Sequence, residues 1–169
     1  MSFEVINPQA TGVSPTRSAK VLDVASSRTI HTGMTQEAHL LATGSDTGDV
    51  YGLFHYEARP AEATKNLHLH KEMTEAFFVL EGNPTLFNGT KWERVGPGRL
   101  LQVPPQAVHG FYNDTDHVAR MLMLFVPGVP REKFFSGLNE IFASGRKLSQ
   151  QEWDEFYAEH DQFMVREQL

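Results

Sequence analysis

The sequence predicts an all-β domain, either a sandwich or a barrel, followed by α-helices. Two observations indicate this fold class. Between residues 39 and 126, short apolar runs alternate with turn residues at intervals typical of antiparallel strands. After residue 126, apolar residues recur at helical spacing instead. The length of 169 residues suits one well-buried domain and is short for two.

We divide the chain into three segments. Residues 1–38 are rich in Ser, Thr and Pro, and we expect an N-terminal arm with a possible strand near residues 19–24. Residues 39–128 are expected to form the β-domain, a sandwich or a barrel. Within it, Asn88-Gly89 predicts a two-residue hairpin turn in which both residues take a positive φ, and the Gly-Pro-Gly at residues 96–98 predicts another sharp turn.

Residues 129–169 are predicted to form a C-terminal helical extension. Pro130 is well placed to begin a first helix, and Gly145 is well placed to end it. Ser149 and Glu152 match a capping box at the start of a second helix. We expect the aromatic face of this second helix to be a packing stripe against the barrel or a partner subunit rather than a cofactor site. Its members are Trp153, Phe156, Tyr157 and His160.

The composition narrows the possible functions. The chain has no cysteine, which excludes disulfides, thiolate metal sites and cysteine nucleophiles. A formal net charge of −6 without any basic run argues against a nucleic-acid partner. No segment approaches the roughly 20 apolar residues that span a bilayer, and the first residues lack a signal-peptide pattern. We therefore expect a cytoplasmic protein with neither a membrane nor a nucleic-acid partner.

Four residues offer the donor atoms of a transition-metal site: His68, His70, Glu75 and His109. Alternate side chains of a strand share a face, so His68 and His70 point the same way. The interval before Glu75 is long enough for a turn that brings a neighbouring strand alongside, whereas His109 must come from a distant strand. The first two histidines alone are better explained as surface or core residues, so the carboxylate and the third imidazole are needed to favour a metal site.

The spacing of these residues resembles the two signatures of the cupin superfamily. The first signature has intervals of one, four and six residues between successive members, here His68, His70, Glu75 and Gly82. The second has intervals of five, four and three residues, here between Gly98, Pro104, His109 and Asn113. The chain departs from the pattern at Glu62 and Gln106, where the family usually has glycine, and both departures concern turns rather than ligands. A looser likeness over residues 40–145 resembles small single-domain cupins of the quercetin 2,3-dioxygenase-like type.

This resemblance implies a cupin jelly-roll, or double-stranded β-helix, barrel with a metal inside and the helices outside. The metal would be a divalent transition metal, namely iron, nickel, manganese, cobalt, copper or zinc. Four protein ligands on a six-coordinate ion would leave two positions for water, dioxygen or substrate. The resemblance favours a metal-dependent dioxygenase that acts on a flavonol-like or other enolisable aromatic small molecule, with Glu75 as the candidate general base.

Two other classes stay open. A non-oxidative cupin enzyme, such as an isomerase or decarboxylase, would need a cationic residue near the metal, for which Arg120 is a candidate. A binding or sensing module would hold metal and ligand without turnover. In each case we expect exposed aromatic area on the C-terminal helices to favour a homodimer.

Strand parity also suggests substrate contacts. Asn66 shares the face of His68, while Phe77 and Phe111 share faces with Glu75 and His109 and would form an apolar wall. Either His55 or Tyr56 should face the pocket, and Tyr56 is our candidate contact. Four further histidines have no partner at ligand spacing and are interpreted as surface or packing residues: His31, His39, His117 and His160.

Overall fold

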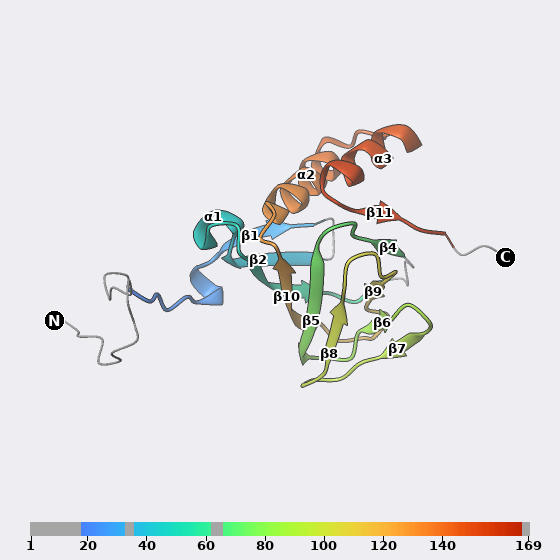
Figure 1. The fold of residues 1–169 in the computed structure, drawn as a ribbon. Helices are drawn as coiled ribbons and strands as arrows, with labels where there is room; N and C mark the ends of the chain where they lie inside the picture. The colour runs from blue at the N-terminus through green and yellow to red at the C-terminus, as the bar shows by residue number, and fades with distance from the viewer. Residues whose placement is uncertain (1–17, 33–35, 62–65, 167–169) are drawn as a thin grey trace, which may run out of the picture.

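A computed structural model describes residues 18–32, 36–61 and 66–166 of the chain (Figure 1). Eleven strands and three α-helices, with a 3-10 turn η1, occur in these ranges. In chain order they are η1 Val24–Ser26, β1 Arg28–His31, β2 Gln36–Ala42, α1 Gly44–Thr47, β3 Gly52–Ala58, β4 His68–Leu69, β5 Thr74–Glu81, β6 Thr85–Phe87, β7 Trp92–Arg94, β8 Leu100–Val103, β9 Gly110–Tyr112, β10 Ala119–Val126, α2 Arg131–Ser144, α3 Gln150–Glu159 and β11 Phe163–Met164.

The strands form a jelly-roll of antiparallel sheets, which confirms the predicted fold class. One sheet has six strands in the order β1-β2-β3-β10-β5-β8, a second has the order β7-β6-β9, and β11 pairs with β4. The hydrophobic core draws on both larger sheets, because it joins Phe54, Phe77 and Met121 from the first to Leu86 from the second. Strands β3, β10 and β5 are neighbours in the sheet although they are far apart in the chain. Residues from separate sequence motifs can therefore lie close together in this fold.

Strand β5 shows the alternation expected of a half-buried strand. Glu75, Phe77 and Val79 are each at most 2% exposed, whereas Phe78 and Leu80 are 38% and 40% exposed. The predicted inner face of this strand is therefore confirmed, with Glu75 at its inward-facing start.

The two predicted turns occur, but one differs in detail. Strands β6 and β7 form the expected hairpin, with Phe87 paired to Trp92 across four loop residues rather than two. Only Gly89 has a positive φ there, because the Asn88 side chain accepts hydrogen bonds from the backbone N–H groups of Thr90 and Lys91 and closes a wider turn. The Gly-Pro-Gly turn is confirmed, with Gly98 at a φ of 80°.

The strand expected near residues 19–24 is wrong. Val21 is fully exposed and Leu22 is 57% exposed, so this apolar run has no sheet or core against which to form a strand. Asp23 instead caps the 3-10 turn by accepting a hydrogen bond from Ala25 N–H. The six-stranded sheet begins at Arg28, before the residue 39 at which we placed the barrel. The division at residues 38 and 128 stays a prediction.

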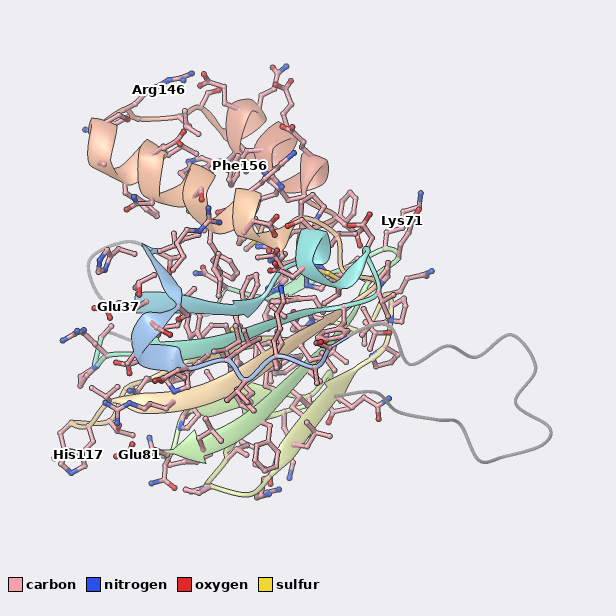
Figure 2. The ribbon with its side chains drawn as sticks, turned by 90° about the vertical axis from the view of Figure 1, so that its left-hand side faces the viewer. Glu37, Lys71, Glu81, His117, Arg146 and Phe156 are labelled. Carbon is pink, nitrogen blue, oxygen red and sulfur yellow. The ribbon has the colours of Figure 1, made fainter. Side chains whose placement is uncertain are left out.

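The two C-terminal helices are confirmed with their caps. Helix α2 follows Pro130 and ends before Gly145, which is left-handed, and helix α3 begins after Ser149 with Glu152 completing the capping box. The helices pack together through aromatic rings, and Phe134 stacks on Phe156 with 5.6 Å between ring centroids. The helices form a layer at one end of the barrel, and Phe156 lies in this layer (Figure 2). Glu81 and His117 lie at the opposite end of the barrel. Among the described residues no helix is both long enough and apolar enough to cross a membrane.

Candidate metal centre

The four predicted ligands are brought together in the interior of the barrel. His68 lies on β4, His70 directly after it, Glu75 on β5 and His109 directly before β9. Each offers a ligand atom within 4.8 Å of the others. Their exposed fractions are 8%, 1%, 2% and 1% in that order. Buried ionisable groups at this density are stable only when they are paired or coordinate a cation.

Backbone pairing explains how His109 reaches the two histidines of the first motif. His68 and His109 form an isolated antiparallel bridge, in which each backbone N–H donates to the other residue's carbonyl at 2.9 Å. Their imidazole rings lie 4.2 Å apart between centroids. The expectation that His109 comes from a separate part of the sheet is therefore confirmed, and the register of the bridge fixes its position.

All three imidazoles are oriented by backbone carbonyls. The Nδ1 atoms of His68, His70 and His109 lie 3.2, 2.6 and 3.1 Å from the carbonyl oxygens of Asn66, Asp161 and Ala107. Because a carbonyl oxygen only accepts, each Nδ1 carries a proton, and Nε2 is the nitrogen left to bind a metal ion. This is the tautomer that a metal-binding histidine needs.

The carboxylate of Glu75 completes the donor set. Its Oε2 lies 2.9 Å from Nε2 of both His70 and His109. Burial alone would raise the pKa of Glu75, but hydrogen bonds from His109 and His70 outweigh that effect and hold the pKa well below its usual range. Burial, followed by the neighbouring His109, lowers the pKa of His68 to about 3, so this ring is neutral at neutral pH.

These observations fit a divalent transition metal. Both ring nitrogens of His70 and of His109 face oxygen atoms, Nδ1 a backbone carbonyl and Nε2 the Glu75 carboxylate. The three Nε2 atoms and Glu75 would hold a metal ion, which would replace the contacts between Nε2 and Glu75 and offset the charge of the buried carboxylate. Three imidazoles and one carboxylate are hard-to-borderline donors that suit such an ion.

A cavity of about 280 Å³ opens at this centre. Its walls include His68 and Glu75 together with Tyr56, Asn66 and Phe111, three of our four predicted substrate contacts. The fourth, Phe77, does not line the cavity, because it lies behind the wall and packs on the rings of His109 and Phe111 at 5.9 and 5.5 Å.

Of the two alternatives on β3, Tyr56 is the one that faces the cavity. Its hydroxyl donates to Gln36 Oε1 and lies 3.3 Å from Thr32 Oγ1. Burial raises the pKa of Tyr56 above its usual value, so this hydroxyl stays protonated. His55 points to the other face of the sheet, where its ring lies 5.4 Å from that of His39.

The outer face holds a second group that our sequence interpretation missed. His39, His55 and Glu57 place ligand-type atoms within 4.8 Å of one another, so His39 does have partners at ligand spacing. The reason is the cross-strand register, in which His39 lies opposite His55. Arg120, our candidate cation for a metal-bound substrate, is on this outer face too and is wrongly placed for that role. It bonds to Glu57 at 2.9 Å and also to Glu81.

The C-terminal extension forms the other half of the cavity, which the sequence did not reveal. We interpreted the aromatic face of the second helix as a packing stripe, and its rings do pack. Several side chains of the extension also line the cavity: Arg131, Phe134, Phe135, Leu138, Phe142, Tyr157, Gln162 and Met164. The helical spacing of the apolar residues signalled a buried face and carried no information on what that face covers.

The end of the extension also contacts the candidate metal ligands. Met164 on β11 pairs with His68 on β4 (Figure 1). The carboxylate of Asp161 accepts hydrogen bonds at 2.9–3.1 Å from three successive backbone N–H groups, those of residues 71–73. These residues connect His70 to the strand that carries Glu75, so the tail holds the ligand loop in place.

Comparison with known proteins agrees with this architecture. The family described as the cupin domain matches residues 54–125. A curated relative, quercetin 2,3-dioxygenase of Bacillus subtilis (strain 168), is 36% identical over 73 residues. That alignment covers 43% of this chain and 21% of the relative, so the chain spans about a fifth of the curated protein that it matches.

Solved structures show the same fold at low sequence identity. The polyketide cyclase RemF from Streptomyces resistomycificus is 23% identical with a TM-score of 0.55, over 64% of this chain and 80% of that one. KdgF from Halomonas sp. has a TM-score of 0.59 at 13% identity, over 68% and 99% of the two chains. A predicted oxalate decarboxylase from Thermotoga maritima has a TM-score of 0.57 at 14% identity, over 64% and 99%. The family match and these likenesses lead to one conclusion: residues 54–125 match the cupin domain, the chain has the cupin fold, and it resembles quercetinase-like cupins.

Proposed function

We propose that this cupin is a metal-dependent dioxygenase that acts on a flavonol-like or other enolisable aromatic small molecule. The observation that carries the proposal is the position of the donor set, three Nε2 atoms and the Glu75 carboxylate, at the wall of a cavity lined by aromatic rings. The likeness of residues in the central region to a quercetin 2,3-dioxygenase supports the reaction class. Because fold alone does not decide function, the reaction needs its own test.

The four ligands would hold the metal, and a bound divalent ion would supply a Lewis-acidic centre for a substrate oxygen. Glu75 would accept the proton of the substrate hydroxyl. Its pKa is held low by hydrogen bonds from His70 and His109, and those bonds disappear when the two Nε2 atoms bind a metal instead. A bound cation would itself favour the ionised carboxylate, so Glu75 would act as a base by leaving the metal or by sharing a proton with the substrate hydroxyl.

The cavity walls would position the substrate. Phe111 offers an apolar ring face, and Phe77 supports it from behind. Tyr56 offers a buried hydroxyl whose proton is retained, and Asn66 offers a polar edge near His68. These side chains, together with the helices that cover the cavity, would exclude water from the reacting oxygen atoms.

Oxygen consumption tests the proposal. Protein loaded in turn with iron, nickel, manganese or cobalt should consume dioxygen when quercetin or a related enol is added. Glu75→Gln should abolish most of that uptake, while Glu72→Gln, a change of an exposed carboxylate in the neighbouring loop, should leave it unchanged. Absence of uptake with every metal across a panel of enols and catechols would contradict the dioxygenase proposal.

A second candidate is a non-oxidative cupin enzyme, and one observation favours it. Such an enzyme needs a cation near the metal for an acidic substrate, and the buried Arg131 lines the cavity together with Glu75. Product analysis under anaerobic conditions separates the two candidates, because an isomerase or decarboxylase needs no dioxygen.

The assembly and the location of the protein stay predictions. A homodimer is still expected from exposed apolar side chains, since Phe142 of α2 is 54% exposed. Light scattering at several protein concentrations tests the dimer. The cytoplasmic location is tested by cell fractionation.

A further inference from the structure

A buried cation without an acidic partner lines the cavity. Arg131 is the first residue of α2 and is only 4% exposed. Among the residues that the structure describes, no Asp or Glu oxygen lies within 4.0 Å of its guanidinium nitrogens. The described arginines that form ion pairs have side chains that are at least 34% exposed. Arg131 therefore differs from them in both burial and pairing.

The contacts of Arg131 leave part of its donor capacity unused. Nη2 donates to Gln162 Oε1 at 2.6 Å and Nη1 donates to the carbonyl of His160 at 3.1 Å. The guanidinium lies over the ring of Phe134, 3.8 Å from its centroid. Nε is buried and has no partner among the described residues. An arginine has five N–H donors, so the contacts seen satisfy fewer than half of them.

The charge balance of the cavity favours an anion beside Arg131. Burial lowers the pKa of Arg131 to about 10, while Glu75, Asp161 and Tyr56 act in the opposite direction. The side chain is therefore still charged at neutral pH. When a divalent ion binds, Glu75 is taken up as its ligand, and the cavity then carries more positive than negative charge. Unpaired buried charge is costly, so a ligand anion that pairs with Arg131 would be favoured.

We propose that Arg131 binds an acidic group, a carboxylate or an ionised enol or phenol, of an aromatic substrate whose other end reaches the metal centre. This inference rests on the proposed small-molecule site and narrows its substrate class to aromatic acids. The ring of such a ligand would lie against the phenyl rings of α2, Phe134 and Phe135, which also line the cavity. A planar fork of N–H donors recognises a carboxylate through two parallel hydrogen bonds.

A matched pair of ligands tests the proposal without any turnover. 2-Naphthoate and 2-naphthamide have nearly the same shape and differ in charge. Their dissociation constants are measured by calorimetry on the protein with its metal as purified. We expect naphthoate to bind roughly 10-fold or more tightly than naphthamide, the discrimination typical of one charged hydrogen-bonded contact. Equal affinity, or no binding of either ligand, would overturn the proposal.

Gln162→Glu separates Arg131 from the metal as the source of that preference. The new carboxylate is nearly isosteric and would lie where Gln162 Oε1 now accepts from Arg131, so it supplies an internal anion. We expect the ratio of the naphthamide to the naphthoate dissociation constant to fall to within about 3-fold of unity. A preference that persists in this variant would show that Arg131 only ties α2 to the tail, and would refute the assignment.

Arg131→Gln and Arg120→Gln complete the set. Arg131→Gln should also lose the naphthoate preference, provided that circular dichroism shows a folded protein. Arg120 pairs with Glu57 and Glu81 on the outer face, so Arg120→Gln should keep the full preference. Failure of the dioxygenase assay leaves these binding results intact, and failure of the ligand preference leaves the oxygen-uptake test intact, so the two proposals fail separately.

Discussion

The carboxylate of Asp161 is predicted to act as a clamp on the metal ligands, although it lies 91 residues from His70 along the chain. Its side chain accepts three backbone N–H groups of residues 71–73, and its own peptide carbonyl accepts the Nδ1 proton of His70 at 2.6 Å. Asp161→Gly removes the carboxylate while tolerating the backbone, because Asp161 has a φ of 53° and glycine takes that conformation without strain.

The expected magnitude follows from these contacts. Hydrogen bonds to a charged group contribute roughly 1.5–3 kcal/mol each, but water competes for the exposed N–H groups of Lys71 and Glu72. Counting mainly the half-buried bond from Met73 N–H, we expect a loss of about 2 kcal/mol in the free energy of unfolding. Asp161→Gly keeps the carbonyl that accepts from His70 but frees the loop between His70 and Glu75, and loss of such a supporting contact lowers metal affinity by roughly 10- to 100-fold.

Two measurements test this prediction. Metal affinity is measured by competition with a chromophoric chelator, and stability by urea unfolding of the metal-free variants. Asp161→Asn should be intermediate, because its amide oxygen still accepts from the loop. Asp154→Asn, a change on the surface of α3, serves as the control. If the metal affinity of Asp161→Gly is within about 2-fold of that of the parent protein, well short of the roughly 10-fold loss expected, the carboxylate does not help to order the ligands.

Three further predictions concern the barrel. Phe54→Ala removes a fully buried ring and should lower the free energy of unfolding in urea by about 3–5 kcal/mol. Phe78→Ala removes a ring that is 38% exposed and should lower it clearly less. Equal losses would mean that the core is not where we place it. Gly82→Ala should destabilise the protein by well over the roughly 1 kcal/mol expected for Gly98→Ala. Both glycines have a positive φ, but a Cβ at Gly82 would lie 2.8 Å from Ala119 Cα, whereas at Gly98 nothing lies within 4 Å, so similar melting temperatures would contradict the packing. Burial, followed by the neighbouring His39, lowers the pKa of His55 in the folded protein. Above the unfolded-state pKa of about 6.5, neutral His55 therefore makes its full contribution to stability. That contribution is lost as the pH falls towards the lower pKa of the folded state. The loss of stability between about pH 7.5 and about pH 5 should therefore be smaller in His55→Gln than in the parent protein, and an unchanged or larger loss would reverse the sign of this argument.

Local patterns in the sequence were sufficient where one element decides the outcome. The capping box at Ser149 and the left-handed end at Gly145 depend on contacts within a few residues, and both are confirmed. The inward direction of Glu75 follows from the two-residue period of a strand with one buried face. The expectation near residues 19–24 was wrong because an apolar run becomes a strand only where a neighbour completes its hydrogen bonds.

The sequence by itself predicted the four candidate metal ligands, since strand parity shows that His68 and His70 share a face, and the resemblance to the two cupin signatures adds Glu75 and His109. Only the tertiary structure decided what surrounds them. The carbonyl that orients His70 and the cation that lines the cavity come from Asp161 and Arg131, on a tail that folds back over the barrel. Helical periodicity predicts that a face is buried, but the partner of that face depends on contacts across tens of residues. Those contacts become fixed only when the helices and the final strand close the open end of the barrel.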